Sequence, residues 1–124
     1  MSAVTNIMIL TLLDEDDESH DLFIDHLKVF TDSVRCREFL KINYGGGNKC
    51  LEADVFVGAF NAIDRKLFCN TIKQMRLILD DFEFDNLQIA IKSQEDYIWK
   101  IVKASELRVE MLTWTLIIYY SKEK

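Results

Sequence analysis

Five consecutive acidic residues, Asp14–Glu18, are the densest group of chemically capable side chains in the chain. They follow the apolar run NIMILTL and precede a segment with helical spacing. Carboxylates in this position either cap the positive end of a helix in water or are the remains of a cation site at the end of a strand. The sequence contains no intact catalytic motif, so we predict no catalytic residues, no bound metal and no cofactor.

Other polar motifs point to no chemistry of their own. His20 and His26 are six residues apart and cannot share one helix face, as two zinc-binding histidines at i and i+4 would. We interpret both as solvated or partly buried histidines. The stretch GGGNK lacks the ending and spacing of a phosphate-binding loop, and it is interpreted as a flexible turn.

Polar residues do follow three short apolar runs. Asp14 and Glu15 follow the first run, Asn61 follows the second, and Ser93 ends the third. If the runs are parallel strands, their carboxyl ends meet at one edge of the sheet, where ligands bind in such folds. Carboxylates there would hold Mg²⁺, a further carboxylate would accept a phosphoryl group, and a hydroxyl would sense its arrival. The spacing therefore suggests a phosphoryl-accepting pocket.

The elements that would position these residues alternate between strand and helix patterns. Apolar runs predict strands at Ile7–Leu13, Ala53–Ala59 and Leu87–Ile91. Helical spacing predicts helices after each run, with the following apolar residues: Leu22, Phe23, Leu27 and Phe30; Ile63, Leu67, Ile72, Met75 and Leu79; Tyr97, Ile98, Ile101 and Val102. Residues 33–44 and 109–120 fit either type. The alternation predicts an α/β fold, a three-layer parallel sheet flanked by helices. The alternative is a small all-α bundle, because short apolar runs also occur in buried helices.

At these residues the chain resembles the receiver domain of two-component response regulators. LLDEDDESHDLFIDHL is similar to the first strand, acidic pair and first helix of that family, with Asp14 and Glu15 as the pair. The acceptor aspartate is expected about 44 residues after Glu15, where the chain has Ala59. ADVFVGAFN, with Asn61, is similar to the third strand, and LQIAIKS, ending at Ser93, to the fourth.

The resemblance implies a flavodoxin-like fold whose pocket is degenerate. A methyl group at Ala59 cannot accept a phosphoryl group, and EMLTW offers no match for the family's lysine. Asp14 and Glu15 would then form a degenerate acidic site that holds no metal, and Ala59, Asn61 and Ser93 a pocket that cannot be phosphorylated.

The carboxy-terminal segment is the candidate partner surface. It combines aromatic and aliphatic residues at the end of the chain, where little sequence remains to cover both of its faces. Receiver domains commonly associate through the corresponding region, so the resemblance indicates the same segment. We predict that it binds a protein partner, with a homodimer among the expected assemblies, through Trp114, Leu116, Ile118, Tyr119 and Tyr120.

Composition limits the class of protein. The length of 124 residues and the absence of proline predict a single domain spanning residues 1–124 without a linker. With 15 basic and 21 acidic residues the net charge is −6, which disfavours nucleic acid as a partner. No segment is long and apolar enough to predict a membrane span. Three cysteines without CxxC spacing indicate reduced thiols and a cytoplasmic protein.

The sequence thus predicts a non-enzymatic protein-binding module, a regulatory or adaptor domain of the receiver type. One alternative is a small all-helical interaction protein, of the kind viruses encode, that captures a partner helix in an apolar groove. A further alternative is an enzyme or phosphoacceptor that uses another carboxylate.

Overall fold

A computed structural model describes residues 4–112 of the chain. The elements, in chain order, are β1 (Val4–Leu10), α1 (His20–Ser33), β2 (Leu40–Ile42), β3 (Val55–Asn61), α2 (Arg65–Gln74), η1 (Met75–Leu77), α3 (Asp81–Asp85), β4 (Gln88–Ser93), β5 (Lys100–Lys103), η2 (Ala104–Glu106) and η3 (Val109–Leu112).

The sheet is antiparallel throughout. Its five strands lie in the order β2-β3-β1-β4-β5, and each neighbouring pair is antiparallel. The predicted parallel, three-layer flavodoxin-like sheet is therefore wrong, and so is the alternative of an all-α bundle. The misleading feature was an apolar run in β1 and β4 that continues on both faces of the strand, a pattern typical of buried parallel strands.

The order of elements explains the topology. From β1 to β4 the chain passes through strand, helix, two strands, helix and strand, and β4 lies beside β1 opposite β3. This is the split βαβ arrangement of ferredoxin-like folds, to which β5 adds an edge strand. Such a fold is shared by proteins of many functions and does not by itself indicate an activity.

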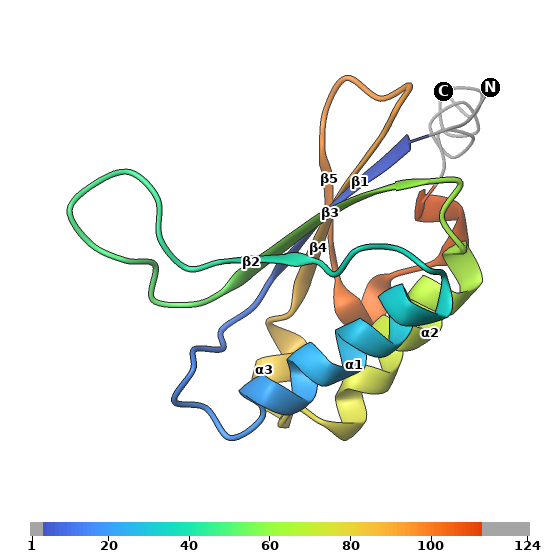
Figure 1. Ribbon diagram of the computed structural model, residues 1–124. Helices are drawn as coiled ribbons and strands as arrows, with labels where there is room; N and C mark the ends of the chain where they lie inside the picture. Colours follow the sequence, from blue (N-terminus) through green and yellow to red (C-terminus); the bar gives the residue numbers. More distant parts are fainter. Residues whose placement is uncertain (1–3, 113–124) are drawn as a thin grey trace.

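The helices cover one face of the sheet. Figure 1 shows α1, α2 and α3 on the same side of the strands, with the β2–β3 loop projecting away from them. The burial of β1 follows this arrangement, because Thr5, Ile7 and Ile9 are buried while the residues between them are only half-buried. We call the side toward the helices the covered face and the other side the open face.

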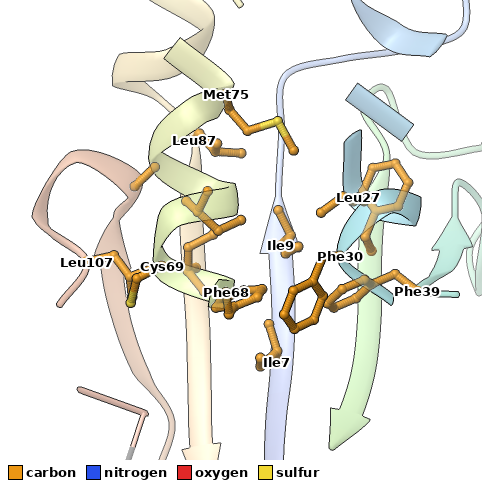
Figure 2. Close-up of a cluster of buried hydrophobic side chains, with 14 of the residues drawn as sticks. Ile7, Ile9, Leu27, Phe30, Phe39, Phe68, Cys69, Met75, Leu87 and Leu107 are labelled. Carbon is orange, nitrogen blue, oxygen red and sulfur yellow. The ribbon is translucent and has the colours of Figure 1, made fainter. Parts of the chain in front are cut away.

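The core lies on the covered face and is rich in aromatic side chains. Phe30 of α1 is central, with its ring 5.4 Å from that of Phe68 and 5.7 Å from that of Phe60. Figure 2 shows these helix residues meeting Ile7 and Ile9 of β1. Each buried aromatic ring contributes a large apolar area, so this layer supplies most of the stabilising burial.

A glycine allows the closest packing in this layer. A Cβ atom at Gly58 would come within 3.0 Å of the Phe39 ring and 3.1 Å of the Phe60 ring. The absence of a side chain on β3 at this point lets Phe39, which precedes β2, pack directly over the strand backbone.

The helices predicted from the spacing of apolar residues agree with the structure better than the predicted strand topology does. The two long helices are confirmed, with α1 at His20–Ser33 and α2 at Arg65–Gln74. The helix predicted around Tyr97–Val102 is wrong, since this stretch forms a turn and then β5. Within residues 4–112, none of the helices combines the length and apolar character needed to cross a membrane.

Candidate functional site

The residues of the predicted phosphoryl pocket do not come together. The antiparallel register pairs Leu10, at the end of β1, with the first residues of β3 and β4. Asp14 and Glu15 follow Leu10, whereas Asn61 and Ser93 pair with Val4 and Thr5 at the other end of β1. A strand of this length separates the two groups by about 20 Å.

The remaining pocket residues also point to different sides. Ala59 and Asn61 are exposed and alternate with buried Phe60, so their side chains lie on the open face. Ser93 is buried on the covered side. The resemblance to receiver domains stays a prediction from sequence pattern alone. The predicted partner residues Trp114, Leu116, Ile118, Tyr119 and Tyr120 lie outside the described residues.

The acidic run forms the loop between β1 and α1. The amide of Asp14 donates to the Asp17 carboxylate at 2.8 Å, and the amide of Asp16 donates to the Asp14 carboxylate at 2.8 Å. These local bonds fold the run into a turn in front of the helix. Among the described residues, no group of three or more histidine, cysteine, aspartate or glutamate side chains is arranged to hold a metal ion.

The end of this loop meets α3, and a groove lies between them. The Ser19 hydroxyl donates to the Glu83 carboxylate at 3.2 Å, and Glu83 also forms the capping box of α3 with Asp80. The groove has a volume of about 390 Å³, and its lining is half acidic: Glu18, Ser19, Leu22, Ile78, Asp80 and Glu83.

A buried histidine and aspartate fix the start of α1 to the start of β3. His20 Nε2 lies 2.5 Å from Asp54 Oδ2, and each side chain is about 95% buried. The other ring nitrogen of His20 lies 3.2 Å from the exposed carboxylate of Asp21. The Asp54 backbone is held as well, because its N–H donates to the Leu13 carbonyl at 2.8 Å and its carbonyl accepts from the Thr11 hydroxyl at 2.9 Å.

The pKa of His20 is shifted by two opposing effects. Burial lowers it, because removal from water disfavours the charged ring, while hydrogen bonds to Asp54 and Asp21 raise it; the net pKa lies above the ordinary value. The raised pKa favours the imidazolium form, in which each ring nitrogen donates to a carboxylate. Both ring nitrogens face carboxylates, so the pair holds the loop in place.

A second buried polar group lies in the β4–β5 turn. Asp96 accepts from the amide of Ser93 at 3.1 Å, and Lys100 Nζ lies 3.4 Å from Asp96 Oδ2. Within residues 4–112, the Ser93 hydroxyl and the second Asp96 oxygen are buried and have no hydrogen-bond partner. The ion pair between Lys100 and Asp96 and the hydrogen bond from the Ser93 N–H to Asp96 close the turn and fix the start of β5.

The open face of the sheet has an unusual composition. The described strand residues with side chains on this face are Val4, Asn6, Met8, Leu10, Leu40, Ile42, Val55, Val57, Ala59, Asn61, Gln88, Ala90, Lys92, Ile101 and Lys103. Ten of these fifteen side chains are aliphatic or methionine, and none is aromatic or acidic. A solvated sheet face normally carries alternating polar residues, so this composition requires an explanation.

One row of apolar side chains crosses all five strands. The register places Leu40 beside Val57, Val57 beside Met8, Met8 beside Ala90, and Ala90 beside Ile101. The two ends of the row are well exposed, at 64% for Leu40 and 59% for Ile101, whereas Met8 and Val57 are half-buried and Ala90 is only 4% exposed between its larger neighbours. We call these five residues the transverse row.

The β4–β5 turn extends the apolar surface beyond the edge of the sheet. Tyr97 is 99% exposed, Ile98 is 71% exposed, and Trp99 is partly exposed. These three consecutive large apolar residues lie at the tip of a hairpin and leave much of their surface in contact with water, so they add little to the stability of the monomer. They adjoin Ile101, the exposed end of the transverse row.

Comparison of the chain with protein-family models, with curated proteins and with solved structures found no match.

Sequence reasoning missed the open face although its signal was present. Met8 and Ala90 are apolar residues at positions where a strand with one solvated face would have polar ones. In an antiparallel sheet with helices on one side, apolar residues at these positions indicate an apolar face that the helices do not cover. In a parallel sheet, the same residues would indicate a second layer of helices.

Proposed function

We propose that this chain is a non-enzymatic protein-binding module and that its binding surface is the open face of the sheet. The single observation that carries the proposal is the transverse row, Leu40–Val57–Met8–Ala90–Ile101, which crosses the whole sheet on the side away from the described helices. Contiguous apolar patches of this kind on soluble surfaces mark interaction sites.

The chemistry of the face favours protein over nucleic acid as the partner. Single-stranded nucleic acid binds to sheets through aromatic side chains that stack on bases. The described strand residues of the open face include no aromatic one, and Tyr97 and Trp99 lie in the β4–β5 turn beyond the edge of the sheet. The net charge of −6 repels a phosphate backbone. Aliphatic side chains with a polar rim suit the apolar centre of a protein interface.

The proposed absence of catalysis is supported by the state of the histidine that the structure buries. Both ring nitrogens of His20 are engaged by carboxylates, and the ring is 3% exposed. A general base needs one nitrogen within reach of its substrate.

Site-specific photocrosslinking in cells that express the protein tests the proposal. A photoreactive amino acid at position 57 lies on the open face, and the same amino acid at position 29 lies on the exposed side of α1. We expect a discrete crosslinked protein from position 57 that is missing from position 29. Equal products from both positions, or none from position 57, would contradict the proposal.

A further inference from the structure

The open face is self-complementary between two copies of the chain. We infer that it pairs with the open face of a second copy of this chain, sheet against sheet, about a two-fold axis through Met8. This inference rests on the proposed function, since it names the partner of the same surface. Stacked sheets pack about 10 Å apart with their strands nearly aligned, which places the side chains of the two faces in contact.

The transverse row has the symmetry that such an interface requires. In a two-fold interface the same patch faces itself, so it must be complementary to its own rotated copy. Met8 is at the centre of the row, the smaller residues Val57 and Ala90 lie on either side of it, and the large exposed residues Leu40 and Ile101 form its ends. An axis through Met8 and parallel to β1 superimposes large on large and small on small.

The charges on the face do not oppose this pairing. Among the strands that the structure describes, its only charged residues are Lys92 and Lys103, both on the β4–β5 half of the sheet. The same axis places the two lysines of the partner over the β2–β3 half, more than a Debye length of about 8 Å away. The acidic run Asp14–Glu18 lies in the β1–α1 loop beyond the end of the strands.

The available area predicts a weak dimer. Five strands spaced about 4.8 Å apart, with three open-face positions each along the central strands, give roughly 500 Å² per copy. About 1,000 Å² in total is the lower limit for a specific interface. We therefore expect an equilibrium between monomer and dimer that shifts with protein concentration.

The net charge predicts the sign of the salt dependence. Each copy carries −6, so long-range repulsion between copies is screened as salt is added and dimerisation becomes stronger. The competing arrangement seats the lysines of one copy in the acidic groove beside α3 of the next. That contact would weaken with salt and, because it does not close, would build species larger than dimers.

Sedimentation equilibrium over about 5 to 500 µM protein tests the inference in the full chain. The wild-type chain should shift from monomer to dimer, more strongly in about 0.5 M than in 0.05 M salt. Val57→Lys should remain monomeric at every concentration, because it buries a charge in the stacked faces. Val29→Lys, on the exposed side of α1, is the matched control and should dimerise like the wild type. Circular dichroism establishes that both variants are folded.

A thiol-specific crosslinker locates the axis, because facing positions on stacked sheets lie about 10 Å apart, too far for a direct disulfide. With the exposed Cys36 and Cys50 replaced by serine, Met8→Cys should form a covalent dimer with a short bis-maleimide, whereas Val29→Cys in the same background should not. Equal crosslinking of the two variants would overturn the placement of the axis.

Three results would overturn the second copy as partner: a monomer at 500 µM, a dimer that persists in Val57→Lys, or growth beyond the dimer at low salt. The proposed function fails separately. If the chain is monomeric but position 57 crosslinks to a different protein in cells, self-association is wrong and protein binding by the open face stands.

Discussion

Phe56 and Val57 are neighbours in β3, yet they belong to different surfaces. The Phe56 ring packs 5.4 Å from the Phe23 ring of α1, on the covered face. The Val57 side chain lies on the open face between Leu40 and Met8. Both faces are apolar, but the covered face uses interlocking aromatic rings and the open face uses smaller aliphatic groups in a flat row.

The difference indicates two separate roles for apolar residues in one sheet. Rings packed between a sheet and helices stabilise the monomer, since each buries a large area against several neighbours. Aliphatic side chains left on the open side contribute little to that stability. Their contribution is made when another surface covers them.

The largest expected effect is the loss of a ring from the covered face. Phe30→Ala removes the ring that lies between Phe39, Phe60 and Phe68, and it leaves a cavity at the centre of the core. We expect the free energy of unfolding, measured by chemical denaturation, to fall by about 4 kcal/mol. Val29→Ala, one residue earlier and exposed, should change it by less than about 0.5 kcal/mol. Similar losses in the two variants would show that the covered face is not the core.

A smaller effect is expected at the buried pair that holds the covered layer to the sheet. His20→Gln removes the cation between Asp54 and Asp21, with Lys41 as the nearby opposing charge. We expect a loss of about 3 kcal/mol at mildly acidic pH, because Asp54 is left buried without its partner.

This loss should depend on pH in a defined direction. The pKa of His20 is raised in the folded state, so its contribution is complete below the unfolded value of 6.5 and disappears as the pH rises through the folded pKa. The difference in stability between wild type and His20→Gln should therefore narrow as the pH rises above 6.5 and through the folded pKa of His20. His26→Gln leaves the pair intact and should keep the wild-type slope. A constant difference between wild type and His20→Gln over this range would show that His20 is not charged in the folded protein.

Much of the local structure could be predicted from the sequence, and the topology could not. The spacing of Phe23, Leu27 and Phe30 determined α1, because one face of that helix meets the core. The direction of the strands is decided by long-range pairing, for which a short apolar run carries no signal. The predicted role as a protein-binding module stays a proposal, now assigned to a surface that differs from the predicted one.

Two predictions, the helix around Tyr97–Val102 and the phosphoryl-accepting pocket, are wrong for separate reasons. Tyr97 and Ile98 are apolar although they lie in an exposed turn, and together with Ile101 and Val102 they produce an apparent helical period where the chain forms β5. The predicted pocket is wrong because it requires the strands to be parallel, so that their carboxyl ends meet at one edge of the sheet.

The most direct test of the account compares two methionines. Met8 is at the centre of the open face and Met75 is completely buried under the covered face. Oxidation of each to the sulfoxide by a limited exposure to hydroxyl radicals is followed by mass spectrometry across a dilution series. We predict that Met8 is oxidised in dilute protein and becomes protected as the concentration rises, while Met75 is protected throughout. The proposal that the open face is exposed in the monomer and covered in the dimer would be contradicted by either of two results. One is that Met8 is as protected as Met75 at the lowest concentration, and the other is that the oxidation of Met8 does not change with concentration.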